Sequence, residues 1–344
     1  MTVKQFALLL ITAASGLSTA ASLQAGARQQ PPASGTLLVL SKGDLTMSAV
    51  DPATLKVLGK VPSGPDPHEI VASSDGRMAY IANYNGGGNI LTPVDLVAMK
   101  ALPPIDLGPL AAPHGLAFAG GKLWFTAERA KAIGTYDPAL KKVDWVLGTG
   151  QNRTHMVYVW NDLSRIVTSN VSSATLTIIE KTTAAGRGRG GAPQTDWDET
   201  IVAVGRGAEG FDVSPDGKTI WAANAQDGTI SVVDVASKKV TDTLSANVPG
   251  ANRLKFTPDG TRVFVSSLGG TDVTVLDAAT KREARRIKTG RGAAGIEMQP
   301  DGTRAYVACT PDDYVAVIDV KTLEVTGRID AGRQPDGLAW TVRR

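Results

Sequence analysis

"SPDGKTIWAANAQDGTISVVDVASKKVTDTL" (214–244) decides the fold of this 344-residue chain. A turn at Asp216-Gly217 precedes a run that ends at Asn224, a second run ends at Asp234, and a third follows the next pair of lysines. Short runs rich in β-branched and aromatic residues between Gly and Asp turns are typical of β-strands. The stretch therefore predicts three consecutive short strands.

The same pattern recurs along the chain, each time after a related lead-in. The lead-ins are "HEIVASSDG" (68), "HGLAFAGG" (114), "HMVYVWND" (155), "EGFDVSPDG" (209), "NRLKFTPDG" (252), "AGIEMQPDG" (294) and "DGLAW" (336). Each adds a strand, so a unit of about 43 residues contains four strands. Such a unit cannot bury its apolar faces alone, and radial stacking of units is the β-propeller solution. The sequence predicts an all-β, seven-bladed β-propeller with four-stranded blades.

The two ends of the repeat region complement each other. The region begins with "TLLVLS" and "LTMSAVD", which match the second and third strands of a unit, and ends with "DGLAWTV", which matches the first. We therefore expect the C-terminal strand to join the N-terminal blade and close the ring, leaving no open edge over residues 35–344.

An acid ends the third strand of each unit and precedes small and polar residues. These acids are Asp51, Asp95, Asp137, Glu180, Asp234, Asp277 and Asp319. A side chain in this setting caps the following turn, so we interpret the seven acids as structural.

On these residues the 214–244 pattern resembles the YVTN β-propeller repeat. The chain is similar to YncE-like and lactonase-like seven-bladed propellers over about residues 35–343. The resemblance implies the fold, whereas such propellers include enzymes, binding proteins and scaffolds alike.

The N-terminus has the layout of a secretory signal peptide over residues 1–25, followed by a linker over 26–34. One lysine precedes an apolar run and then small residues. The alternative, a membrane anchor, needs about 20 apolar residues, and this run is shorter. We expect a periplasmic or secreted protein with no membrane span once the signal is removed. A single cysteine, Cys309, excludes an intrachain disulfide.

The net charge of +3 is small and mixed along the chain, so we expect no nucleic-acid partner. The basic clusters at 186–191 and 281–288 are interpreted as solvated charge. We expect a monomer. An insertion, 182–200, is interpreted as a flexible loop and a possible contact for a protein partner.

All three histidines of the chain occupy one repeat position, the first residue of the innermost strand. This position holds His68, His114, His155, Glu209, Asn252, Ala294 and Asp336. Since the ring closes, Asp336 and Glu209 flank the three histidines at a shared central mouth.

Three uses of this arc stay open. Three imidazoles with an open position suit a divalent transition metal of unknown identity. Histidines flanked by carboxylates also suit a metal-free polar ligand that exchanges protons near neutral pH. Finally, the histidines can be structural, and His68 shares strand alternation with Ile70, which would turn the ring between blades.

Further candidates surround the arc. Arg206, Arg291 and Arg333 lie three residues before an inner strand and suit an anionic ligand or solvated charge, and Asn252 is a further ligand contact. The residues that end the second strands are interpreted as structural: Asn83, Glu128, Asn170, Asn224 and Cys309.

Two functional hypotheses follow. In the first, the mouth binds a small ligand with a metal and supports lyase, lactonase or hydrolase chemistry, in which Glu209 or Asp336 moves a proton. In the second, the propeller is a non-catalytic scaffold that binds a protein through its outer loops.

Overall fold

The computed structural model describes residues 35–84, 88–184 and 194–342. Within these ranges the chain forms β-strands, turns and two single-turn 3-10 helices, η2 (Val171–Ser173) and η3 (Thr310–Asp312). The predicted signal peptide and linker lie outside the described residues. Nothing in the described ranges forms a helix of the length and apolar character that a bilayer crossing requires.

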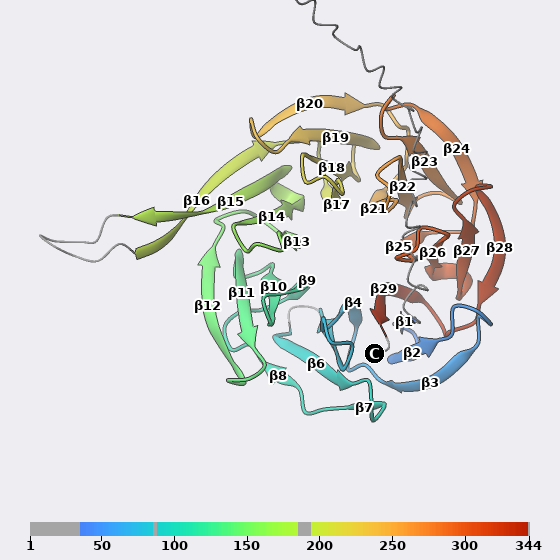
Figure 1. Ribbon diagram of the computed structural model, residues 1–344, viewed down its shortest axis with the longest axis horizontal. Helices are drawn as coiled ribbons and strands as arrows, with labels where there is room; N and C mark the ends of the chain where they lie inside the picture. The colour runs from blue at the N-terminus through green and yellow to red at the C-terminus, as the bar shows by residue number, and fades with distance from the viewer. Residues whose placement is uncertain (1–34, 85–87, 185–193, 343–344) are drawn as a thin grey trace, which may run out of the picture. The chain divides into compact units, whose positions relative to one another are not determined.

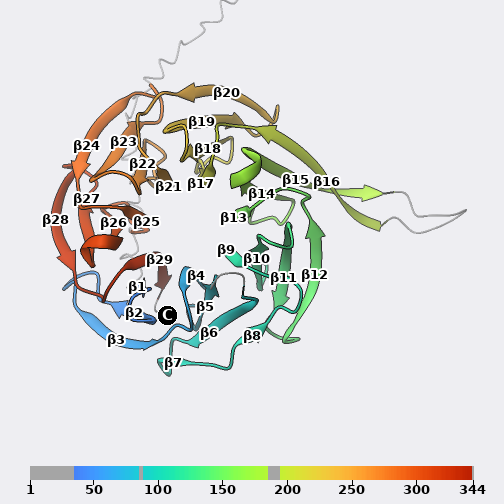
Figure 2. The same cartoon turned by 180° about the vertical axis from the view of Figure 1, so that it is seen from behind.

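Seven antiparallel sheets stand around one axis in the described part of the chain (Figures 1 and 2). The first blade contains β29 (Pro335–Val342), β1 (Gly35–Ser41), β2 (Thr46–Val50) and β3 (Val57–Pro62). The second contains β4 (Pro67–Ala72), β5 (Met78–Asn83) and β6 (Ile90–Asp95), with β7 (Lys100–Ala101) and β8 (Ile105–Asp106) both paired to β6. The third contains β9 (Pro113–Ala119), β10 (Lys122–Ala127), β11 (Ala132–Asp137) and β12 (Lys142–Gly148).

The remaining four blades repeat this order. The fourth contains β13 (Thr154–Val159), β14 (Arg165–Asn170), β15 (Thr175–Ala184) and β16 (Gln194–Ala203), and the fifth β17 (Ala208–Val213), β18 (Thr219–Asn224), β19 (Thr229–Asp234) and β20 (Lys239–Leu244). The sixth contains β21 (Ala251–Phe256), β22 (Arg262–Ser267), β23 (Asp272–Asp277) and β24 (Glu283–Lys288), and the seventh β25 (Ala293–Met298), β26 (Arg304–Cys309), β27 (Tyr314–Asp319) and β28 (Glu324–Ile329). The predicted seven-bladed propeller is confirmed.

The ring closes as predicted. The C-terminal strand β29 pairs antiparallel with β1, in the register that places Leu37 opposite Trp340 and Val39 opposite Leu338. It is the innermost strand of the first blade, so the two ends of the repeat region form one sheet.

The hydrophobic core is divided among the blade interfaces. Each apolar cluster of the described residues combines side chains of two neighbouring blades, as where Tyr80 of β5 packs with Leu123 and Phe125 of β10. A blade that leaves its neighbour therefore exposes apolar surface on both, which makes the ring cooperative.

The innermost strands approach each other most closely at glycines that follow the repeat position of the histidines. A β-carbon at Gly295 would lie 2.2 Å from the carbonyl oxygen of Asp336 in the next blade. The same contact, at 2.4 to 2.5 Å, occurs at Gly115 against His155, at Gly210 against Asn252 and at Gly337 against His68. These interfaces need a residue without a side chain.

Hydroxyl groups on second strands hold other points of the same interfaces. Ser266 Oγ accepts a hydrogen bond from the Arg253 N–H (2.9 Å) and donates one to the Ala294 carbonyl of the next blade (2.8 Å). Thr126 and Ser169 bridge in the same way to the carbonyls of His155 and Glu209. The backbone that carries the candidate site is thus fixed from the neighbouring blade.

The acids at the strand ends cap turns, with one exception. Asp95, for example, accepts hydrogen bonds from the N–H groups of Val97 and Ala98, both at 2.9 Å. Glu180 instead lies 3.2 Å from Arg165 Nε and 2.5 Å from Lys238 Nζ. The exception falls in the blade that carries the insertion.

The insertion differs from the predicted flexible loop. Its described residues belong to a long hairpin, because β15 and β16 pair in register from Thr175 opposite Ala203 to Ala184 opposite Gln194. Figure 1 shows this hairpin extending beyond the outline of the ring.

We predict that Gly295→Ala lowers the free energy of unfolding by about 1–3 kcal/mol, because the methyl group meets a backbone carbonyl that cannot move without its blade. Gly148→Ala is the matched control, since a β-carbon there meets nothing within 4 Å. Urea unfolding of both variants measures the difference. Equal stabilities would show that the blades separate freely at this contact.

Candidate functional site

A cavity of about 350 Å³, here named the mouth cavity, lies where the innermost strands begin. Six residues singled out from the sequence line it together: His68, His114, His155, Glu209, Asn252 and Asp336. Ala294, from the same repeat position, lines it as well. The structure therefore brings this position of every blade to one place on the axis.

A left-handed residue two positions earlier aims this strand entrance. In the described chain it has a positive φ in each blade: Asp66 (43°), Ala112 (58°), Arg153 (56°), Gly207 (75°), Gly250 (62°), Gly292 (56°) and Gln334 (50°). Its carbonyl accepts a hydrogen bond from the backbone after the second strand, as from Tyr84 N–H to Asp66 (3.1 Å). The turn is thus built by the backbone, whichever side chain follows it.

A β-bulge directs the histidines toward the axis. In β9, Pro113 pairs with Ala127 and Leu116 with Phe125, so His114 and Gly115 together face Thr126. The other innermost strands show a register shift at the same place. Because the bulge interrupts the alternation, His68 no longer shares the orientation of Ile70. The possibility that the rings turn between blades is therefore removed.

His155 lies between two carboxylates. Its Nδ1 is 2.5 Å from Glu128 Oε1, and its Nε2 is 2.8 Å from Glu209 Oε2, close enough for an ion pair but not aligned for a hydrogen bond. The ring is 3% exposed. Tyr84 donates a hydrogen bond to the second oxygen of Glu128 at 2.7 Å, and Arg153 Nε lies 3.5 Å from it.

The three imidazoles form a row. The ring centroids of His114 and His155 are 3.8 Å apart, and those of His68 and His114 are 5.3 Å apart. Tyr84 packs edge-on against both His68 and His114. Among the described residues, the buried Nδ1 of His114 has no hydrogen-bond partner. Such an atom marks a place where a water, an ion or a ligand is needed.

His68 is held by a lysine and a carboxylate. Lys42 Nζ lies 3.0 Å from His68 Nε2, and Asp336 Oδ2 lies 3.4 Å from Nδ1. Asp66 Oδ1 also lies 3.2 Å from Nε2, and Lys42 Nζ lies 3.5 Å from Nδ1, so each ring nitrogen faces both the ammonium and a carboxylate. Lys42 also lies 3.2 Å from Asp336 Oδ2, so the three groups form one cluster.

The environments separate the histidines into one charged and two neutral rings. Burial lowers the pKa of His114 well below its usual value, and the neighbouring His155 lowers it further. Burial, with the charge of Lys42, lowers the pKa of His68 to about 4. Burial also opposes charge on His155, but the hydrogen bond to Glu128 and the contact with the Glu209 carboxylate outweigh it and raise its pKa. The two carboxylates thus favour the proton on His155 over His114.

The pKa values of the acidic groups around the row shift in both directions. Burial raises the pKa of Asp336 and, together with the bond to Glu128, raises that of Tyr84 to about 12. Burial acts against ionisation of Glu209 and Glu128, yet the contact of each with the His155 ring lowers the pKa of both, that of Glu209 to about 2. Glu209 is accordingly a permanent carboxylate at neutral pH.

Sequence reasoning missed four residues of this site. Lys42 and Tyr84 line the cavity from the repeat position that follows each second strand, and Arg153 lines it from the left-handed turn. Comparing that repeat position across the blades is the signal that would have found Lys42 and Tyr84. Glu128 was interpreted as structural, but it is the main partner of His155.

The three predicted arginines lie elsewhere. Arg206, Arg291 and Arg333 are absent from the cavity lining, and their side chains are 67–73% exposed. Each pairs with an aspartate of a neighbouring turn at 2.6–2.7 Å: Asp227, Asp312 and Asp44 respectively. The structure does not bring them together with the histidines.

The residues present do not form a ready three-histidine metal centre. No cluster of three His, Cys, Asp or Glu side chains in the described ranges is arranged to hold a metal ion. His155 turns both ring nitrogens toward carboxylates, so a metal bound there would have to displace Glu128 or Glu209. His68 and His114 are neutral, which is the state that binds metals.

No family model matches the chain, and no curated protein does either. Solved structures do match, 1516 chains in all, which shows that the fold is widely shared. One is "a functionally unknown protein from Desulfotomaculum acetoxidans", with a TM-score of 0.72, 12% identity and coverage of 90% of this chain and 100% of that one.

Two further matches have names. Hydrazine synthase from Kuenenia stuttgartiensis has a TM-score of 0.69 and 18% identity over 86% of this chain and 98% of that one. Dihydro-heme d1 dehydrogenase NirN in complex with DHE has a TM-score of 0.62 and 17% identity over 90% of this chain and 76% of that one. At these identities the likeness shows the propeller fold alone.

We predict that at pH 7 the untagged protein contains one imidazolium and two neutral imidazoles. Nitrogen-15 NMR distinguishes the two forms, and the three histidines of the chain are assigned from single His→Gln variants. His155 should be the charged ring, and His68 should take up a proton only near pH 4. A neutral His155 at pH 7 would contradict the ion-pair arrangement.

We predict that Glu209→Gln destabilises the protein at pH 7 and that the loss shrinks in acid. A depressed pKa means that the carboxylate stabilises the fold above its usual pKa of 4.5 and ceases to do so as the pH falls toward 2. The bound on this contribution is on the order of 3 kcal/mol. Urea unfolding at pH 7 and pH 3, beside exposed Glu324→Gln, measures it. A loss independent of pH would indicate packing instead of charge.

Proposed function

We propose that the mouth cavity binds a small amphipathic organic anion. The observation that carries this proposal is the division of the cavity into two unlike halves. Blades one to five contribute Lys42, His68, His114, Arg153 and Glu209. Blades six and seven contribute the small or apolar residues Leu268, Gly292, Ala294 and Pro311 beside the polar Asn252, Arg253 and Thr310. A ligand with one charged and one apolar end satisfies both walls.

The sign of the charge follows from the groups that reach the cavity. Lys42, Arg153, Arg253 and the imidazolium of His155 line it as cations, and Glu209 and Asp336 line it as carboxyl groups. Glu128, which pairs with His155, lies outside the lining. The ionised surface therefore favours an anion.

Arg153 is the group best able to hold that anion. Its side chain is 43% exposed, and its contacts with Glu128 and Glu209 are loose, at 3.5 and 3.9 Å. A guanidinium in such a position can turn a bidentate pair toward a carboxylate of the ligand. A similar fold is on record with a small ligand, since NirN is described in complex with DHE.

A metal at His68 and His114 is a second candidate. It is supported by the neutral state of both rings, by the unpartnered Nδ1 of His114 and by Asp336 beside His68. A metal here would supply Lewis acidity to a hydrolase, lyase or lactonase reaction, and Glu209 or Asp336 would hold the proton that moves. Elemental analysis of untagged protein purified without chelator tests this candidate: about one equivalent of a transition metal supports it, and none rejects it.

A scaffold role is supported by one different feature. The hairpin of β15 and β16 extends beyond the ring in Figure 1, and its Ile201 is 53% exposed.

We include in the proposal that the chain is exported, as its N-terminal layout indicates, and that it belongs with the YVTN-repeat propellers. Fractionation of cells that express the full chain tests export.

We predict that wild-type protein binds phenylacetate more tightly than phenylacetamide, its neutral counterpart, and that Arg153→Gln weakens phenylacetate binding by about tenfold. Isothermal titration calorimetry measures both. Arg206→Gln is the matched control, because this arginine is exposed and outside the cavity. If Arg206→Gln weakens binding as much as Arg153→Gln does, or if phenylacetamide binds equally well, the proposed site is wrong.

A further inference from the structure

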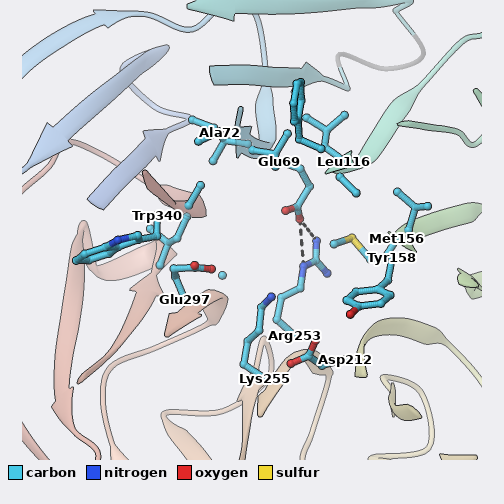
Figure 3. A pocket seen from close by; sticks show the side chains of 18 of the residues that line it. Glu69, Ala72, Leu116, Met156, Tyr158, Asp212, Arg253, Lys255, Glu297 and Trp340 are labelled. Carbon is cyan, nitrogen blue, oxygen red and sulfur yellow. Dashed lines mark hydrogen bonds and ion pairs between the residues drawn. The ribbon is translucent and has the colours of Figure 1, made fainter. Parts of the chain in front are cut away.

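A second cavity lies further along the axis, and Figure 3 shows its charged side chains. This channel cavity has a volume of about 380 Å³ and is lined by the middle and the ends of the innermost strands. The residues that line it play no part in the proposed function of the mouth, with the exception of Arg253, which borders both cavities.

An ion pair includes the one residue that borders both cavities. Arg253 of β21 donates from Nε to Glu69 Oε1 of β4 at 3.1 Å and contacts the same oxygen through Nη2. Both side chains are nearly buried, 13% and 14% exposed, and Figure 3 shows them meeting between strands of two blades. The linings of the two cavities have only Arg253 in common.

The walls of the channel cavity come from one repeat position, three residues after that of the histidines. In four consecutive blades this position holds Tyr158, Asp212, Lys255 and Glu297, and in the other three it holds Val71, Ala117 and Ala339. One side of the cavity is thus polar and charged. The other side is apolar and is extended by Leu116 and Phe118.

Two charged groups of the polar side lack a partner. Asp212 accepts a hydrogen bond from the Phe256 N–H at 2.9 Å. No hydrogen bond or ion pair from a described residue satisfies the Lys255 ammonium or the Glu297 carboxyl group, and Figure 3 shows both pointing into the cavity. Lys255 and Glu297 act on each other and on Asp212 electrostatically but form no ion pair. Half-buried charges in this state favour a ligand that supplies direct counter-charges.

The protonation of these groups agrees with that role. The carboxylate of Asp212 raises the pKa of Lys255 against the effect of burial, so the ammonium stays charged. Burial raises the pKa of Glu297 to about 7, so this carboxyl group ionises readily when a cation arrives.

We propose that the channel cavity binds a zwitterionic α-amino acid with an apolar side chain. The carboxylate of the ligand pairs with Lys255, its ammonium group with Glu297, and its side chain packs on Val71, Ala117 and Ala339. A simple anion would leave Glu297 without a partner, and a simple cation would meet the charge of Lys255. The zwitterion satisfies both groups at once.

Calorimetric titration of the full chain with L-leucine, N-acetyl-L-leucine and L-leucinamide tests this proposal. The last two compounds each remove one of the charges. Wild-type protein should bind L-leucine, and Lys255→Met and Glu297→Gln should each weaken that binding by about tenfold or more. Exposed Lys288→Met and Glu324→Gln are the matched controls and should bind as the wild type does.

The compound series also separates this cavity from the mouth. N-acetyl-L-leucine is an amphipathic anion, so any binding of it at the mouth should be the same in wild type, Lys255→Met and Glu297→Gln. The comparison of compounds on the wild type holds even if a variant fails to fold. The proposal is overturned if neither L-leucine nor L-phenylalanine binds at millimolar concentration, or if the two cavity variants bind L-leucine as the wild type does.

Discussion

The close contact of neighbouring innermost strands at the axis is the constraint on which the rest of this structure depends. At Gly295 and its counterparts the chain leaves out a side chain so that the carbonyl of the next blade can approach. Hydroxyl bridges such as that of Ser266 hold the same carbonyls in other blades. The mouth can therefore bring imidazoles from adjacent blades to a distance of 3.8 Å between their ring centroids.

That proximity determines the charge of the site. Two imidazolium rings in contact would repel each other where little solvent screens them, so one neutral and one charged ring is the stable combination. The charge settles on His155 because Glu128 and Glu209 both face it, while His114 has no carboxylate among its close contacts. Glu128 of the third blade, at the repeat position that holds Lys42 and Tyr84 in the first two blades, thus determines which imidazole of the row is protonated.

The repeat made the fold and part of the site predictable from sequence. Counting equivalent positions was enough to place His68, His114 and His155 at one mouth and to close the ring through β29. It did not show the β-bulge, because an extra residue in a strand leaves no compositional mark. It also favoured Arg206 and its counterparts over Arg153, since repetition suggested a shared role, whereas exposed Arg–Asp turns repeat for structural reasons.

Arg253 borders both cavities of the central channel, and its ion pair with Glu69 joins the innermost strands of two blades beside them. Since the two linings share only this residue, every other wall position of one cavity can vary without altering the lining of the other. Substitutions in one wall can therefore change what that cavity binds and leave binding in the other cavity unchanged.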